Sequence, residues 1–244
     1  MHSLGLEVAN VSSRDLALGP VAVHDLAESL GVQLVSANVQ VRGRPWLQPY
    51  VVLRRHVDGR DLRVGITGVT MRGHTDWPDS LGLQITDPRA AARDILPVLE
   101  AQSDLVVLLA YMPAADVDTL AVALRGFDVF VSGSGDARDL PRPGGRTPAV
   151  LAPGTKAKQL AWVALRAEGD GFLVAAGGMQ GLDAKVGDDP EIAKRVAGYK
   201  SRLAKPPATP PEPTIAPTDS DGIREAAPAL HGAAQASPGV LRVP

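Results

Sequence analysis

Two short stretches of the sequence could bind an anion. Ser132-Gly-Ser-Gly-Asp136 follows an apolar run, and its glycines would let backbone N–H groups approach a phosphate. It lacks the lysine and the spacing of a P-loop, so a tight turn is the alternative interpretation. In Arg14-Asp15, the arginine could hold an oxyanion through two hydrogen bonds, or it could pair with the aspartate and cap the next helix.

Metal ligands are scarce in this chain. The histidines are His2, His24, His56, His74 and His231. His74 follows a predicted strand end, but only Asp76 and Asp79 lie near it in sequence, so we interpret the histidines as surface or packing residues. There is no cysteine, which excludes thiol nucleophiles, cysteine-ligated zinc and iron–sulfur clusters.

The charge balance excludes a further class of function. The 25 Lys and Arg residues face 27 Asp and Glu residues, which gives a net charge of −2. A protein that binds nucleic acid by neutralising phosphates would carry a basic excess, so no nucleic-acid partner is expected. The longest apolar run, residues 105–112, is far shorter than the ~18 residues of a membrane span. The first residues do not form a secretory signal, with its basic and then apolar regions.

An α/β fold must position these side chains, because short apolar strands alternate with amphipathic helices. Asp58-Gly59 predicts a hairpin turn, and the continuous apolar run Leu105–Ala110 predicts a strand buried on both faces. The last three predicted strands read as an antiparallel meander. The predicted strands span residues 32–39, 49–57, 62–70, 105–110, 127–131, 148–152, 160–167 and 172–176.

Four helices are predicted between and after these strands. Asp87 and Pro88 are typical of an N-cap and a first helical residue, and they open a helix that ends near Gln102. Asp188-Asp-Pro-Glu191 caps the last one. The other two span residues 20–30 and 115–124.

The C-terminal segment has a different composition. Nine of the 21 prolines lie between Pro206 and Pro244, and each proline fixes φ and removes a hydrogen-bond donor. We therefore expect a folded domain over residues 1–204 and a linker or disordered tail over residues 205–244.

Several stretches, in this order, resemble the N-terminal domain of the 5′-nucleotidase-like metallophosphoesterases. Val35-Ser-Ala-Asn-Val39 is similar to that family's SANI strand, and Phe127-Asp-Val-Phe-Val-Ser-Gly133 to its IDVIIGG strand. Val64-Gly-Ile-Thr-Gly-Val-Thr70 is similar to VGIIGLT, and Asp188-Asp-Pro-Glu-Ile-Ala193 to DDPEVA. The similarity is collinear over about residues 1–204. It implies part of a four-layer αββα sandwich with two divalent metal ions at the strand ends.

The resemblance also maps the family's metal site onto this chain, where its residues are replaced. The motif Gly-Asn-His-Glu falls on Ser12 to Asp15, so the metal-ligating Asn becomes Ser13 and the His becomes Arg14. The later histidines become Tyr111, Ser134 and Asp136, of which only Asp136 could bind a cation. Holding two ions needs Asp, His and Asn side chains, so we expect neither a metal cofactor nor a catalytic residue.

Two hypotheses follow for function. The first is a degenerate domain without catalysis, a structural or interaction module or a fragment of a larger protein, in which Arg14, Gly133, Ser134 and Gly135 could still bind an anion. The second is a metal-dependent phosphohydrolase of nucleotides or other phosphate esters, completed by an upstream segment. For a full-length protein the resemblance implies a periplasmic or extracellular location. The partner would be an unidentified protein, missing upstream and downstream domains, or a second copy paired through an exposed sheet edge, with Val8, Val11 and the 32–39 strand as the exposed group.

Overall fold

A computed structural model describes residues 5–73, 82–135, 137, 144, 148–169 and 171–203. The chain divides into two units, residues 1–187 and 188–244. The predicted boundary at residue 204 stays a prediction, because residues 204–244 lie outside the described ranges.

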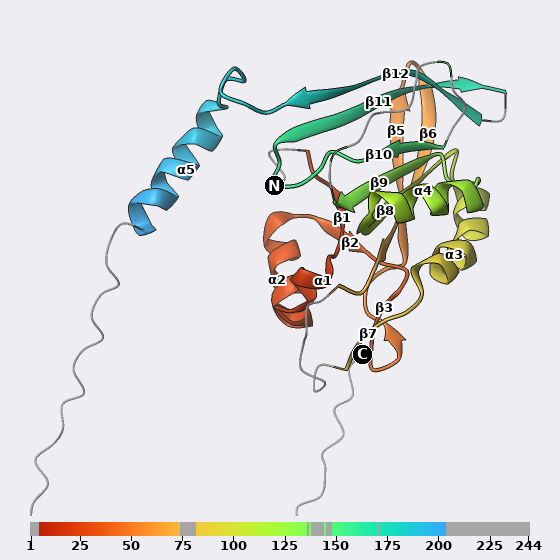
Figure 1. Ribbon diagram of the computed structural model, residues 1–244, viewed down its shortest axis with the longest axis horizontal. Coiled ribbons are helices and arrows are strands. Elements are labelled where there is room, and N and C mark those ends of the chain that lie inside the picture. Colours follow the sequence, from red (N-terminus) through yellow and green to blue (C-terminus); the bar gives the residue numbers. More distant parts are fainter. Residues whose placement is uncertain are drawn as a thin grey trace, which may run out of the picture. The chain divides into compact units, whose positions relative to one another are not determined.

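A five-stranded sheet forms the centre of the first unit (Figure 1). Its strands, in spatial order, are β10 (Ala149–Leu151), β9 (Val129–Ser134), β8 (Leu105–Pro113), β6 (Arg60–Thr70) and β5 (Tyr50–Val57). The first four run parallel, and β5 pairs antiparallel with β6 through the predicted Asp58-Gly59 turn. Parallel strands bring their carboxyl ends to one edge of a sheet, so the loops that follow β6, β8 and β9 share that edge.

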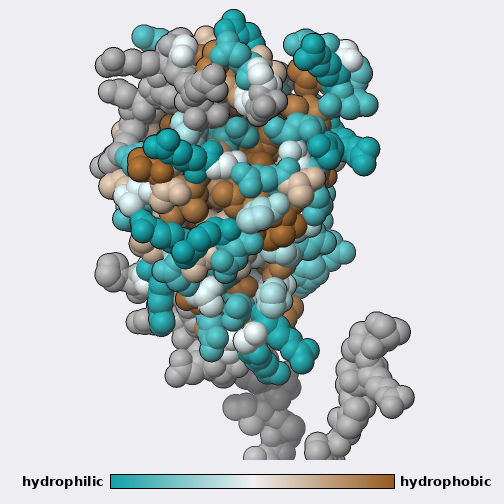
Figure 2. All heavy atoms as spheres, turned by 90° about the vertical axis from the view of Figure 1, so that its right-hand side faces the viewer, coloured by the Kyte–Doolittle hydropathy of each residue, from teal (hydrophilic) through white to brown (hydrophobic). Residues whose placement is uncertain are grey.

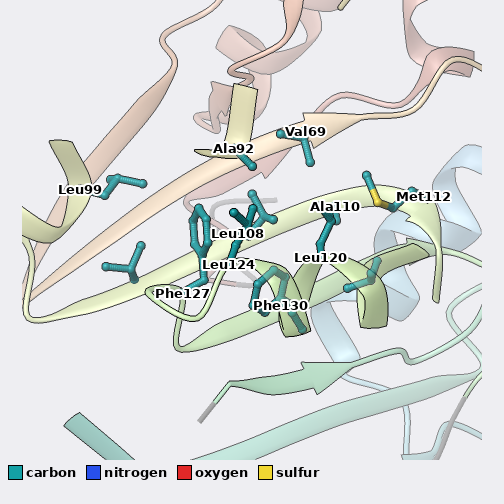
Figure 3. Close-up of a cluster of buried hydrophobic side chains, with 13 residues drawn as sticks. Val69, Ala92, Leu99, Leu108, Ala110, Met112, Leu120, Leu124, Phe127 and Phe130 are labelled. Carbon is teal, nitrogen blue, oxygen red and sulfur yellow. The ribbon is translucent and has the colours of Figure 1, made fainter. Parts of the chain in front are cut away.

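Two helices cover one face of this sheet. They are α3 (Pro88–Gln102), which the Asp87 side chain caps by accepting the Ala90 N–H, and α4 (Ala114–Ala123). Alternate residues of β8 point toward them, and Phe127 and Phe130 meet edge to face at 5.5 Å between ring centres. Figure 3 shows this cluster, with Leu99 of α3 and Leu120 of α4 directed at the β8 side chains. On the α3 side of the molecule, hydrophilic side chains separate the hydrophobic ones (Figure 2).

A smaller parallel sheet of β1 (Val8–Asn10) and β2 (Gln33–Val35) lies against the other face of the large sheet. The helices α1 (Ser13–Leu16) and α2 (Pro20–Leu30) follow β1, and α2 covers the small sheet. From α2 to α3 and α4 the order of layers is therefore helix, sheet, sheet, helix, as Figure 1 shows. This is the α/β sandwich that the resemblance implied.

The remaining strands form two further sheets. β3 (Val39–Val41) pairs with β4 (Arg44–Pro45) and β7 (Leu83–Ile85). β11 (Gln159–Glu168) and β12 (Gly171–Gly181) form a long antiparallel ribbon. The second unit contains α5 (Pro190–Leu203), whose first turn is capped by the Asp189 carboxylate, as predicted. No helix in the described ranges is long and apolar enough to cross a membrane.

Three predictions about the strands are wrong in part. The predicted 32–39 strand is interrupted, because β2 ends at Val35 and β3 begins at Val39. β10 is not part of an antiparallel meander, since it pairs parallel with β9. The strand β8 is fully buried on only one face, because Leu105, Val107 and the other odd residues up to Tyr111 are only partly buried.

The apolar group predicted to be exposed is also wrong in most of its members. Val11 and Val39 are 1% exposed and Val35 is fully buried, while Val8 is half-buried. Two exposed large apolar residues instead lie beside β1, Leu18 in the turn before α2 and Leu26 of α2 itself.

Candidate functional site

The carboxyl ends of β1, β6 and β8 meet at one place, the edge at which this kind of sheet carries its chemistry. The Asn10 side-chain amide donates to the carbonyls of Val69 and Leu109, at 2.8 and 3.0 Å. The Thr70 hydroxyl donates to the carbonyl of Val11 at 2.6 Å. The N–H of Met71 donates to the carbonyl of Tyr111. The structure therefore brings the end of β1, which Ser13 and Arg14 follow, and Tyr111 of β8 to one edge.

Ser13 and Arg14 lie just after β1. Ser13 is 2% exposed, and a Cβ at Gly73 would lie 2.7 Å from its hydroxyl oxygen, so the chain beyond β6 passes close to Ser13. Arg14 is exposed. Asp15 does not pair with it in the described structure: the Asp15 carboxylate accepts the Ser12 N–H at 2.8 Å, and the Ser12 hydroxyl accepts the Asp15 N–H.

Ser12 and Asp15 thus form a reciprocal capping box, which supports the interpretation that Asp15 caps a helix. The aspartate caps, but it caps its own helix α1 rather than the next one, and it does so through the backbone instead of through Arg14. Arg14 is thus an exposed residue of α1, the short helix that follows β1.

Tyr111 and the glycine loop form the other half of the candidate site. A Cβ at Gly133 would lie 3.5 Å from a ring carbon of Tyr111, so ring and loop are in contact. The Ser132 hydroxyl donates to the carbonyl of Met112, and Ser134 lies opposite Pro113 in the ladder. Gly135 has φ +93°, which favours glycine, so the loop turns tightly here. The next residue, Asp136, lies outside the described residues.

The described histidines lie away from this edge. His56 is an exposed residue of β5 whose ring pairs with Asp61 at 2.9 Å. His24 is an exposed residue of α2. Both are surface residues, as predicted, while His2, His74 and His231 lie outside the described ranges, as do Asp76 and Asp79.

The residues at the strand ends do not fit a pair of divalent metal ions. Among the described residues there, Ser13, Arg14 and Tyr111 carry a buried hydroxyl, a guanidinium and a phenol, whereas a pair of divalent ions is held by carboxylates, imidazoles and amides. Within the described ranges, no three His, Cys, Asp or Glu side chains gather closely enough to hold an ion.

Sequence reasoning missed the residues that hold this edge together. Asn38 is fully buried, and its amide donates to the carbonyls of Thr70 and Thr86, both at 2.8 Å. Its side-chain oxygen accepts the N–H of Thr70 at 2.8 Å. A polar residue inside an apolar segment was the available signal, because a buried amide must find hydrogen-bond partners.

Comparison with known proteins agrees with this architecture. No protein-family model and no curated protein matches the sequence. Among solved structures, a 5′-nucleotidase precursor from Thermus thermophilus is similar over 83% of this chain, with a TM-score of 0.68 and 22% identity. The calcineurin-like phosphoesterase YfkN from Bacillus subtilis has a TM-score of 0.65 over 83% of this chain, with 18% identity. The NAD nucleotidase of Haemophilus influenzae has a TM-score of 0.62 over 80% of this chain, with 16% identity.

The match covers only part of these proteins. This chain spans 44% of the Thermus nucleotidase, 72% of YfkN and 50% of the NAD nucleotidase. The resemblance inferred from the sequence is thus confirmed at the level of fold. The chain has the α/β fold of a 5′-nucleotidase-like metallophosphoesterase domain, and it spans part of the length of the solved structures that share it.

Proposed function

We propose that this chain is a degenerate metallophosphoesterase domain that has kept the fold and lost the catalysis, and that it acts as a structural or interaction module. The observation that carries the proposal is the set of residues at the carboxyl ends of the strands. Ser13, Arg14 and Tyr111 stand where the family resemblance implies an asparagine and two histidines.

Loss of the metal ligands would abolish catalysis because the activation barrier to phosphate-ester hydrolysis is high. Enzymes lower it by about 8 to 23 kcal/mol, and in a two-metal site most of this comes from a metal-bound hydroxide and from charge stabilisation by the ions. Arg14 can attract a phosphate, but attraction alone binds the ground state and the transition state about equally and gives no acceleration. Weak anion binding is therefore the most that Arg14 and the Gly133–Gly135 loop would retain.

A second candidate is a phosphohydrolase of nucleotides or other phosphate esters that is completed by a segment upstream of Met1. The preserved convergence of β1, β6 and β8 favours it, because this edge would be ready to receive further ligands. An upstream segment would leave Arg14 and Tyr111 in place, however, so the usual two-metal mechanism would still lack ligands.

Metal content and turnover separate the two candidates. The purified chain, dialysed after exposure to Mn, Zn, Co or Fe, is expected to hold no stoichiometric metal by elemental analysis. It is also expected to show no hydrolysis of nucleoside monophosphates or an aryl phosphate above background. Two ions per chain, or metal-dependent turnover abolished by Arg14→Ala combined with Asp136→Ala, would favour the enzyme.

Residual anion binding has its own control. Inorganic phosphate is expected to bind weakly and in a salt-sensitive manner, and Arg14→Ala should remove this binding. Arg44→Ala removes another exposed arginine, in β4, and should leave phosphate binding unchanged. Equal losses in both variants would show that the binding is diffuse attraction to the surface.

A further inference from the structure

A cleft of about 450 Å³ lies between α2, the start of β2 and the segment over residues 46–48. A cavity of this size is in the range that takes a small molecule. Backbone hydrogen bonds fix its walls, since the Ser36 N–H donates to the carbonyl of Gln48 and the Val32 N–H to the carbonyl of Ala27, both at 3.0 Å. The residues that line it are separate from those of the candidate site at the strand ends. The cleft is therefore a second place at which the first unit could bind a ligand.

Aromatic, apolar and amide groups share the lining of this cleft. Trp46 is half-buried, because it packs against the core cluster that includes Leu16 and Val39 and also lines the cleft. The side chains of Gln33 and Gln48 are exposed, and in the described part of the chain neither amide has a hydrogen-bond partner. The partly buried apolar residues of the lining are Val32, Leu34 and Leu47. The cleft thus offers an apolar surface beside amides that are free to bond to a ligand.

The charges around the cleft are negative. The Glu28 carboxylate lines it, and within the described ranges this side chain has neither an ion pair nor a hydrogen bond. The cleft also lies beside the carboxyl end of α2, where the helix dipole is negative and the last turn carries no basic residue to offset it. His24, one turn before Glu28, is the other titratable residue in the lining. No Lys or Arg is among the described residues that line the cleft, so it should attract a positively charged ligand.

Three other classes of ligand fit these residues less well. An anion would meet the Glu28 carboxylate without a basic side chain to bind it. A metal ion requires more ligands than Glu28 and His24, and nowhere in the described ranges do three His, Cys, Asp or Glu side chains gather to hold one. A neutral apolar molecule would cover the Glu28 carboxylate without pairing it, which costs free energy.

We propose that this cleft binds a small organic cation, with its charged nitrogen toward Glu28 and its apolar body against Trp46. An ammonium N–H donates to the Glu28 carboxylate in a charge-assisted hydrogen bond, and the side-chain oxygens of Gln33 and Gln48 can accept its other protons. The apolar body gains from leaving water at the aromatic wall. This inference does not depend on the proposed loss of catalysis.

The test titrates the full 244-residue chain, labelled with nitrogen-15, with benzylammonium and follows the indole N–H signals by nuclear magnetic resonance. The signal of Trp46 is identified by its loss in Trp46→Phe. Benzylammonium between ~0.1 and ~20 mM, at constant ionic strength, should shift this signal with a millimolar dissociation constant. Benzyl alcohol, an uncharged molecule of the same size, should bind at least about fivefold more weakly, because it cannot pair with Glu28.

Two variants of α2 separate the site from diffuse attraction to an acidic surface. Glu28→Gln should weaken benzylammonium binding by about fivefold or more. The matched control is Asp25→Asn, which removes the same charge from an exposed residue of the same helix that does not line the cleft. This control should change the dissociation constant by less than about twofold, because solvent and salt screen the distant charge.

Several results would overturn the proposal. An unshifted Trp46 signal up to the highest benzylammonium concentration would show that the cleft does not bind this class of ligand. Equal binding of benzyl alcohol would show that the apolar body alone is selected. Equal losses in Glu28→Gln and Asp25→Asn would show that the attraction is diffuse.

Discussion

Replacing Asn38 with alanine should destabilise the fold more than most single substitutions. The Asn38 side chain makes three hydrogen bonds from a fully buried position, to the N–H and carbonyl of Thr70 and to the carbonyl of Thr86. Asn38→Ala removes the partner of all three groups. The Thr70 groups are buried, so water replaces the lost bonds only if it enters the space left by the amide.

The magnitude follows from the cost of an unsatisfied buried polar group, about 1 to 3 kcal/mol. Two such groups at Thr70 give a loss of about 2 to 6 kcal/mol in the free energy of unfolding. A domain of ordinary stability has about 5 to 15 kcal/mol in total, so the variant should be folded but clearly weakened.

Urea unfolding followed by circular dichroism measures this loss, provided that the dependence of the unfolding free energy on urea concentration is the same in both proteins. The control is Ser36→Ala, two residues away, because the Ser36 hydroxyl is buried without a hydrogen-bond partner. Removing a hydroxyl that has no partner should leave stability unchanged or raise it by about 1 kcal/mol. A loss below ~1 kcal/mol for Asn38→Ala, or an equal loss for Ser36→Ala, would refute the reasoning.

Three further predictions concern other parts of the chain. Gly68→Ala should lower the free energy of unfolding in urea by about 1 to 3 kcal/mol, because its Cβ would lie 2.7 Å from a backbone carbonyl of β2. The control Gly171→Ala, with open space around the new Cβ, should lower it little. The Arg63 guanidinium lowers the pKa of Asp104 through hydrogen bonds and charge. At a pH above the ordinary pKa of 3.8, the Asp104→Asn variant should therefore be slightly less stable than wild type. The urea midpoints of the two proteins should converge as the pH falls below the depressed pKa of the folded state. Deleting residues 205–244 should leave the melting temperature within a few degrees of wild type, because the prolines of this segment favour a tail that adds little to the core.

Local signals in the sequence predicted the elements well. The Asp58-Gly59 turn, the Asp87 cap of α3 and the Asp189 cap of α5 are found as predicted, because each depends on hydrogen bonds between neighbouring residues. The long β11–β12 ribbon likewise turns at its predicted place.

The errors arose where distant segments decide the structure. β2 and β3 are separate strands because the buried Asn38 between them bonds to Thr70 and Thr86 rather than continuing a ladder. The parallel pairing of β10 depends on β9, and the half-exposed face of β8 depends on how much of the second sheet covers it. At the candidate site, the resemblance placed Ser13, Arg14 and Tyr111 next to strand ends, where the structure has them. It did not predict that Asp15 caps α1 through the backbone, because both interpretations of Arg14-Asp15 centred on the arginine.

The Asn10 contacts have a consequence for the order in which the chain can fold. The Asn10 amide bonds to the carbonyls of Val69 and Leu109, 59 and 99 residues further along. The β5–β6 hairpin closes over a two-residue turn and needs no such distant partner. Because loop closure must be paid for before a distant contact forms, the hairpin and the β6–α3–β8 unit should assemble early and β1 should dock late. During synthesis β1 would therefore be made before β6 and β8 and yet find its place after them, since residue 109 must leave the ribosome before Asn10 can be anchored.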